Sequence, residues 1–170
     1  MKRFLGFVLC LVLLCGCSGK SRSVSPVLQN INFDAAINFY NEVYECDVTL
    51  DGDSNMHLTV VKPDDISGMK LKIGQGGTTA EYMGITYTPK TENFVFCGVA
   101  DTLYGIVGQL RDKTLVIQRD ENCFFEGRID GRAYTFCCAP SGLPLYVEIP
   151  DSSYRMEFLN VKLINADTLD

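Results

Sequence analysis

Hydrophobic and polar residues alternate along most of the chain, and this period of two predicts β-strands. Between residues 44 and 50, for example, Tyr44, Cys46, Val48 and Leu50 alternate with acidic or hydroxyl side chains, as in a strand with one buried face. Similar runs occupy 56–61, 69–73, 79–87, 93–97, 114–119, 123–129, 132–138, 143–149 and 154–163. Because turn-forming residues separate nearly all of them, we expect about ten antiparallel strands.

Two segments instead carry apolar residues at spacings of three and four, which is typical of helices. The first begins at Asn32, a possible N-cap, and has the apolar residues Phe33, Ala36, Ile37, Tyr40 and Val43. The second is 99–110, with the apolar residues Val99, Leu103, Ile106, Val107 and Leu110 and Asp101 as a possible cap. Gly105 and Gly108 each cost this helix about 1 kcal/mol relative to alanine. Such a helix either packs closely on the sheet or is easily displaced.

The pair Asp-Gly at 130–131 lies between two alternating runs and predicts a hairpin with a two-residue type I′ turn. This turn fixes the register of the two strands. It places Gly127 opposite Tyr134, so that an aromatic ring lies across a glycine. It also places Cys123 opposite Cys138, within the range of a disulfide.

The N-terminus has the order of a bacterial lipoprotein signal. Lys2 and Arg3 precede eleven residues without charge, a stretch too short to span a bilayer. The sequence Leu-Cys-Gly-Cys at 14–17 resembles the lipobox, which implies cleavage before Cys17 and lipidation of its sulfur. We therefore expect a signal peptide at 1–16, the lipidated cysteine and a flexible tether at 17–29, and one domain at 30–170. The protein would then be exported and anchored to the outer face of the bacterial cytoplasmic membrane.

The charge balance excludes one class of partner. The chain has 15 basic and 21 acidic residues, and loss of Lys2 and Arg3 takes its net charge from −6 to −8. A protein that binds the nucleic-acid backbone needs the opposite sign, so we expect no nucleic-acid partner. Membrane attachment would rest on the acyl chains rather than on basic residues.

No group of residues forms a recognisable catalytic or metal-binding motif. One histidine, His57, cannot build a His-rich metal site, and no Cys-x-x-Cys pair is present. Residues 51–55 begin like a calcium loop, but Met56 and Lys62 occupy the positions that require glycine and a carboxylate. The five cysteines beyond Cys17 are an odd number and are expected to be buried free thiols. We expect no cofactor and no enzymatic activity.

Several phrases resemble the LolA/LolB/LppX superfamily of lipoprotein-sorting and lipid-binding proteins. They are LTVVKPDDISGMKLKI, with Pro-x-x-Ile-x-Gly at 63–68, EYMGITY, and SGLPLYVEIPDSSYRMEFLNVKL. The resemblance implies an α+β fold: a curved antiparallel half-barrel of about ten strands, covered on its concave face by the two helices. Members hold acyl chains against that face. A clostridial relative of this fold instead regulates a cell-wall amidase by binding it.

The expected function is therefore a membrane-anchored module that binds a lipid or acyl chain in an apolar half-barrel. The alternative is a scaffold or regulator of a cell-envelope enzyme with a packed interior and no small ligand. Cavity volume separates the two. Strand parity and the helical stripes predict that the cavity is lined by Ile37, Tyr40, Tyr44, Val48, Leu58, Val60, Leu71, Leu103, Ile106, Phe125, Phe136, Val147, Met156 and Phe158.

Overall fold

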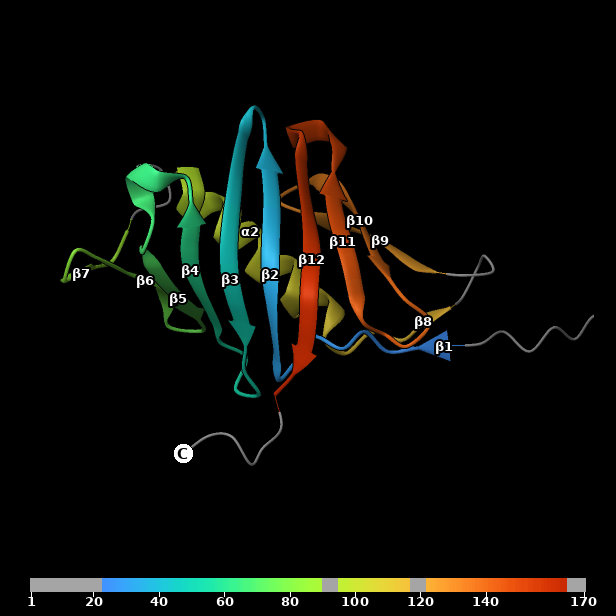
Figure 1. The fold of residues 1–170 in the computed structure, drawn as a ribbon. Coiled ribbons are helices and arrows are strands. Elements are labelled where there is room, and N and C mark those ends of the chain that lie inside the picture. Colours follow the sequence, from blue (N-terminus) through green and yellow to red (C-terminus); the bar gives the residue numbers. More distant parts are fainter. Residues whose placement is uncertain (1–22, 90–94, 117–121, 165–170) are drawn as a thin grey trace, which may run out of the picture.

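The computed structural model describes residues 23–89, 95–116 and 122–164. Ten strands form one open antiparallel sheet in the order β7-β6-β5-β4-β3-β2-β12-β11-β10-β9 (Figure 1). Their bounds are β2 Ile31–Phe39, β3 Glu42–Leu50, β4 Met56–Lys62, β5 Lys70–Gly74, β6 Gly77–Tyr82, β7 Ile85–Tyr87, β9 Cys123–Ile129, β10 Arg132–Cys138, β11 Pro144–Ile149 and β12 Tyr154–Leu163. A second, two-stranded sheet joins β1 (Ser23–Val24) to β8 (Leu115–Val116). Two short 3₁₀ helices lie at Asp64–Ile66 and Pro150–Ser152.

One α-helix, α2 (Val95–Leu110), lies against one face of the large sheet. In the view of Figure 1 it crosses behind β3, β2 and β12. It contacts both β5 and β9, which are the third and the tenth strand of the sheet. The sheet therefore curves around the helix, and the chain uses α2 to pass from one half of the sheet to the other.

The predicted helix at Asn32 is wrong, because this segment is the central strand β2. Ile31, Phe33, Ala35 and Ile37 all point to the core, and each is at most 3% exposed. The apolar residues of this segment fit both a period of two and a helical stripe. Pairing with β3 on one side and β12 on the other selects the extended form. The expectation that two helices cover the sheet is therefore wrong: α2 is the one α-helix of the described residues.

The remaining differences concern element boundaries. α2 begins at Val95, so the described part of the strand expected at 93–97 is helical, and Asp101 lies within the helix rather than at its start. The segment 79–87 is a hairpin rather than one strand, with a turn at Met83 and Gly84 where both φ angles are positive. Of the strand expected at 114–119, β8 covers 115–116, and 117–119 lie outside the described residues.

The hairpin at 130–131 is confirmed. Asp130 and Gly131 have φ angles of 49° and 79°, as a type I′ turn requires. The register places Gly127 opposite Tyr134 and Cys123 opposite Cys138. A Cβ atom on Gly127 would lie 2.5 Å from the Tyr134 ring, so the tyrosine covers this glycine directly. Glycine is needed here because the ring occupies the space of any side chain.

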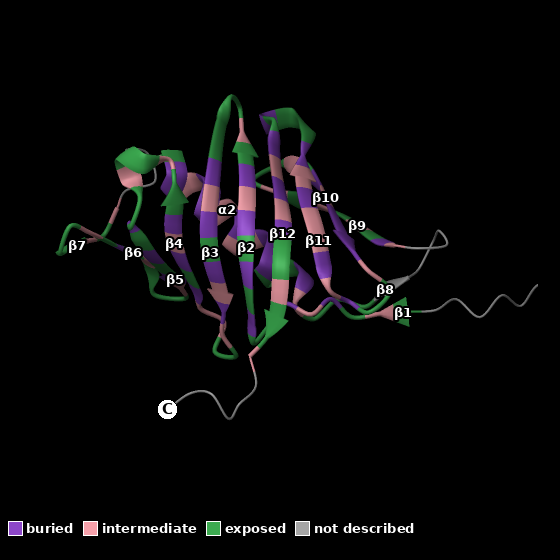
Figure 2. Ribbon diagram, in the orientation of Figure 1, coloured by how far each residue is buried: buried purple, intermediate pink, exposed green. Residues whose placement is uncertain are grey.

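Burial alternates along the central strands, as Figure 2 shows on β2, β3 and β12. The inward residues of these strands and the buried side of α2 form a single hydrophobic core. Its aromatic contacts include Phe33 with Phe158, whose ring centroids are 4.8 Å apart. Burial of this apolar surface, at about 25 cal/mol per Å², stabilises the sheet on its helix.

Candidate ligand-binding site

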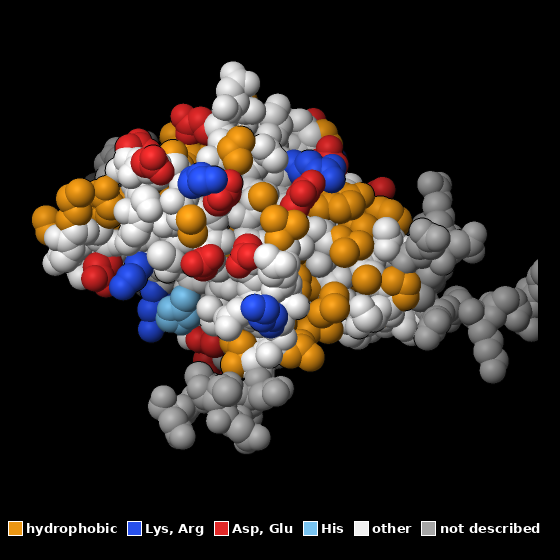
Figure 3. Space-filling view, in the orientation of Figure 1, with side chains coloured by type: hydrophobic (Ala, Val, Ile, Leu, Met, Phe, Trp, Pro, Cys, Tyr) orange, Lys and Arg blue, Asp and Glu red, His pale blue; other side chains and the backbone are white. Residues whose placement is uncertain are grey.

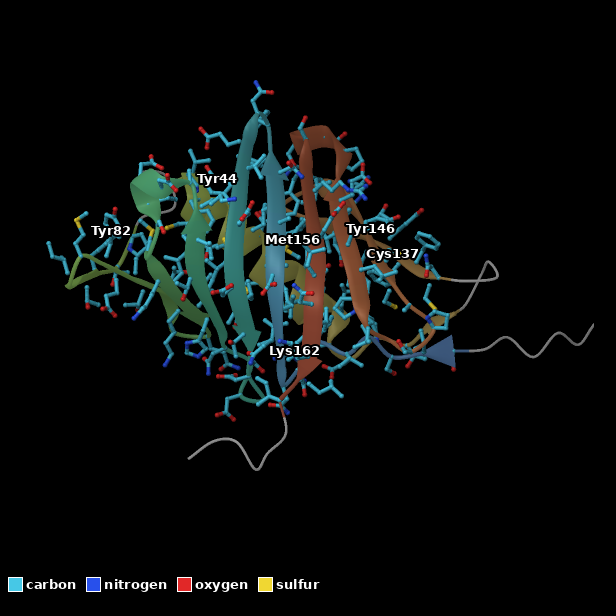
Figure 4. All side chains as sticks on the ribbon, viewed as in Figure 1. Tyr44, Tyr82, Cys137, Tyr146, Met156 and Lys162 are labelled. Carbon is cyan, nitrogen blue, oxygen red and sulfur yellow. The ribbon has the colours of Figure 1, made fainter. Side chains whose placement is uncertain are left out.

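Most of the residues predicted to line a cavity are packed in the core beneath α2. Twelve of the fourteen are buried, and Phe125 is partly buried. Figure 4 shows two of them, Tyr44 on β3 and Met156 on β12, on the central strands. Tyr40 differs: it lies in the turn between β2 and β3 with a φ of 55° and is 66% exposed, because the segment is a strand and not a helix. Their role in ligand binding stays a prediction.

A half-open cleft of about 530 Å³ lies beside the N-terminal half of α2. It separates the helix from the β9–β10 turn and from the adjoining ends of β11, β12 and β2. None of the fourteen predicted residues lines it. The lining residues are Phe39, Val95, Gly98, Val99, Asp101, Thr102, Ile129, Asp130, Arg132, Ile149, Ser152 and Tyr154.

The lining of this cleft is a mixture of apolar and polar side chains. Phe39, Val95 and Ile129 supply the accessible apolar surface, whereas Val99 and Ile149 lie behind it and are buried. Two acids and one base contribute charge: Asp101 and Asp130, and Arg132, whose guanidinium lies 3.6 Å from the Asp130 carboxylate. Such a mixture suits an amphiphile, whose apolar part contacts the walls while its polar part stays hydrated.

Tyr154 contributes an unsatisfied polar group next to the cleft. Its side chain is 2% exposed, and its hydroxyl has no hydrogen-bond partner among the described residues. Burial, followed by the neighbouring Cys46, raises the pKa of Tyr154. A buried hydroxyl without a partner costs about 1–3 kcal/mol, so a water molecule or the polar group of a ligand would be stabilised there.

Beyond the cleft, the C-terminal half of α2 is fastened to the β9–β10 hairpin. The side-chain amide of Gln109 donates to the Arg128 carbonyl oxygen at 3.0 Å and accepts a hydrogen bond from the Tyr134 hydroxyl at 2.9 Å. A Cβ atom on Gly105 would lie 2.8 Å from the Ile129 Cδ1 atom, so glycine allows the helix and hairpin to approach. These contacts close one end of the cleft.

On its other flank, α2 contacts β3 and β6 directly. The Phe96 ring lies 4.9 Å from the Tyr44 ring, measured between centroids. The Thr78 hydroxyl donates to the Asp101 carboxylate at 2.7 Å. Burial, together with Glu42, to which its hydroxyl donates, raises the pKa of Tyr44. Asp101 thus contributes to both sides of the helix: it lines the cleft, and its carboxylate is held by Thr78 of β6.

Strand parity could have identified the cleft residues at the strand ends. Phe39 continues the inward series that contains Ile37, and Ile149 continues the series that contains Val147. Tyr154 precedes Met156 with the same parity. No sequence signal shows that the β9–β10 turn stands across from Gly98 and Thr102, since that depends on the curvature of the sheet.

A second hollow, of about 330 Å³, lies on strands β4 to β7. Leu58 and Leu71 contribute to it, but its polar lining includes His57, Lys70, Lys72 and Glu81. These side chains point away from the core, and in Figure 3 charged groups gather over this part of the sheet.

The other groups considered for chemistry are dispersed. His57 lies on the outer face, with Nε2 3.6 Å from Asp51, in the turn region between β3 and β4. In the same region Asn55 donates two hydrogen bonds to the Asp51 carboxylate. Cys46, Cys97, Cys123, Cys137 and Cys138 are all buried free thiols. Over residues 23–89, 95–116 and 122–164, no three His, Cys, Asp or Glu side chains are grouped so that they could hold a metal ion.

The predicted lipidation site, Cys17, lies outside the described residues. The part of the chain that the structure describes contains no helix long and apolar enough to cross a membrane. No family model matches the chain, and neither does any curated protein.

Proposed function

We propose that this protein is a binding module for the apolar chain of a lipid or a similar amphiphile, and that the cleft beside α2 is the binding site. The observation that supports this is the cleft itself: a half-open volume of about 530 Å³ lined by both apolar and polar side chains. Sites for small molecules usually have volumes of about 300–1,000 Å³. An acyl chain would replace water against Phe39, Val95 and Ile129, and its polar end would remain near Arg132.

The proposal also draws on the resemblance of the sequence to the LolA/LolB/LppX superfamily. An open sheet that curves around a helix is compatible with the half-barrel of that superfamily. The site differs from the one expected, because the interior beneath α2 is packed and the cleft opens beside the helix. A ligand would therefore enter at the cleft rather than fill the concave face.

We further propose that the protein acts at the outer face of the cytoplasmic membrane, attached through acyl chains on Cys17. The order of charged start, apolar stretch and lipobox supports this. Labelled palmitate incorporation tests it: the Cys17→Ala variant should remain uncleaved and take up no label. Full labelling of this variant would exclude Cys17 as the anchor.

The binding proposal is tested by titrating the purified, delipidated protein with a fluorescent fatty acid. We expect saturable binding at micromolar concentration. Thr102→Phe places a ring in the cleft and should weaken binding about tenfold or more, because the space for the chain is lost. Gly108→Phe is the matched control: it adds the same side chain to an exposed position of α2 with no atom within 4 Å.

A second candidate function, a scaffold for an envelope enzyme, is favoured by the packed core beneath α2. In that case neither the protein nor its Thr102→Phe variant would bind the probe saturably. Equal binding by the protein and by both variants would place the ligand outside the cleft.

A further inference from the structure

Three of the buried cysteines lie together where β9 begins and β10 ends. Cys123 and Cys138 face each other across the two strands, and both are 0% exposed. Cys137 is also buried but is not part of the core beneath α2; it is paired in register with Tyr146 of β11, and both residues are labelled in Figure 4.

We propose that Cys123 and Cys138 are a redox site and form a reversible disulfide bond across β9 and β10. In a hairpin with a two-residue type I′ turn, the pair next to the turn is hydrogen-bonded, and every second pair thereafter is also hydrogen-bonded. Counting from Ile129 and Arg132 makes Cys123 and Cys138 such a pair. Their Cα atoms are then about 5.5 Å apart, close to the most frequent separation in disulfides.

The oxidant is a second disulfide, carried by a small molecule or by a dithiol oxidase of the envelope. One cysteine thiolate attacks a sulfur of that disulfide, which forms a mixed disulfide and releases one thiolate of the oxidant. The second cysteine then attacks the mixed disulfide. The bond between Cys123 and Cys138 forms, the oxidant is reduced to two thiols, and these thiols receive the two protons that the cysteines lose.

Burial controls how fast this exchange can occur. Burial, followed by the neighbouring Cys123, raises the pKa of Cys138 to about 12, so this thiol stays protonated at neutral pH in the closed protein. β9 is the outermost strand of the sheet and pairs with β10 alone within it. Edge strands open locally more readily than central ones. Oxidation therefore proceeds through opening of β9, after which the bond holds the strand closed.

The cross-link has a structural consequence that does not depend on what the cleft binds. It would tie the edge strand to β10 at the end opposite to the turn, which carries Asp130 and Gly131. The chain between the two cysteines forms a loop of about 15 residues, and closing such a loop restricts the unfolded chain. We expect the oxidised protein to have a Tm roughly 5–10 °C higher than the reduced protein.

Peptide mapping tests the proposal on the full-length protein purified in detergent. The folded protein is incubated with oxidised glutathione at pH 8, blocked with iodoacetamide and cut with trypsin. Cleavage at arginine places Cys123 in peptide 120–128, and Cys137 and Cys138 together in peptide 133–155. We expect these two peptides to be linked, and dithiothreitol to release them and return Tm to the reduced value.

Cysteine variants identify the sulfur atoms involved. Cys137→Ala is the matched control: it removes the adjacent thiol and should leave the linked peptides at the level of the unmodified protein. Cys138→Ala should abolish them. Two results would overturn the proposal: unlinked peptides in the folded protein after complete reaction, or a link that survives Cys138→Ala and disappears in Cys137→Ala. The linked peptides are measured first in the unmodified protein. That measurement alone can overturn the proposal, even if a variant fails to fold.

Discussion

The two flanks of α2 differ in how tightly the helix meets the sheet. On the flank that faces β3 and β6, Phe96 packs on Tyr44 and Asp101 accepts a hydrogen bond from Thr78. On the flank that faces the β9–β10 turn, the contacts lie near Gln109, in the C-terminal half of α2. The cleft lies beside the N-terminal half of the helix. The comparison indicates that contacts with β3 and β6 anchor the helix. On the flank that faces the β9–β10 turn, the helix is held near Gln109 and leaves space for a ligand beside its N-terminal half.

The largest effect should come from the anchoring flank. Phe96→Ala removes a buried ring from its contact with Tyr44 and should lower the free energy of unfolding by about 3–5 kcal/mol. Urea denaturation measures this loss. The neighbouring residue gives the comparison: Val95 is 62% exposed at the cleft, and Val95→Ala should cost less than about 0.5 kcal/mol. Equal losses would mean that the two flanks are packed alike.

At the C-terminal half of α2, Gln109→Ala should lower the free energy of unfolding by about 2 kcal/mol, because it leaves the buried Tyr134 hydroxyl without its partner. The double variant Gln109→Ala with Tyr134→Phe removes that hydroxyl as well, and should therefore be more stable than Gln109→Ala alone. Denaturation of the two single variants and the double variant measures this coupling. If the loss in the double variant equalled the sum of the losses in the two single variants, the hydrogen bond between Tyr134 and Gln109 would not stabilise the position of the helix.

Alkaline pH should weaken the anchoring flank. Burial, followed by Asp101, raises the pKa of Cys97 to about 11 from an ordinary value near 9. Between these two values the unfolded chain loses a proton that the folded protein keeps, so stability present below pH 9 falls as pH rises to about 11. This group accounts for about 1 kcal/mol between pH 9 and 10. Cys97→Ala should reduce the fall by that amount in urea denaturation at each pH.

The smallest effect separates the two glycines of α2. Gly108→Ala should raise the free energy of unfolding by about 0.5–1 kcal/mol, since the helix gains propensity and no atom lies in the way. Gly105→Ala should gain less, because its Cβ atom must displace the tip of Ile129. Thermal denaturation compares the two. A larger gain for Gly105→Ala would show that α2 and the hairpin do not approach each other at this point.

The hairpin and the central strand show where the sequence sufficed and where it did not. At 130–131 the Asp-Gly pair has a strong local preference for a type I′ turn, and the whole register of β9 and β10 followed from it. At the turn between β2 and β3 the chain has Tyr40, with a φ of 55°, which carries no such signal. Without a visible turn, the apolar residues from Phe33 to Val43 fitted a helix as well as a strand.

The cleft could not be found for a related reason. Parity identifies Phe39, Ile149 and Tyr154 as inward-facing, but it does not predict that Ile149 and Tyr154 are fully buried while Phe39 is only partly buried. Which of them stay accessible depends on where the helix ends its contact with the sheet. That boundary is set by the Gln109 contacts and by the close approach at Gly105, both of which join elements distant in the sequence.

By itself, the sequence determined the alternating strands β3 to β5 and β9 to β12, the 130–131 hairpin and the helical stripe at 99–110, because each follows from local preferences of neighbouring residues. The tertiary structure decided that 31–39 is the central strand: pairing with β3 on one side and β12 on the other satisfies its backbone groups, and its alternate residues then enter the core. It also placed a cleft beside α2 that is lined by none of the fourteen residues expected to line a cavity. Packing between distant elements, which no local pattern encodes, fills the interior and leaves the cleft at one flank.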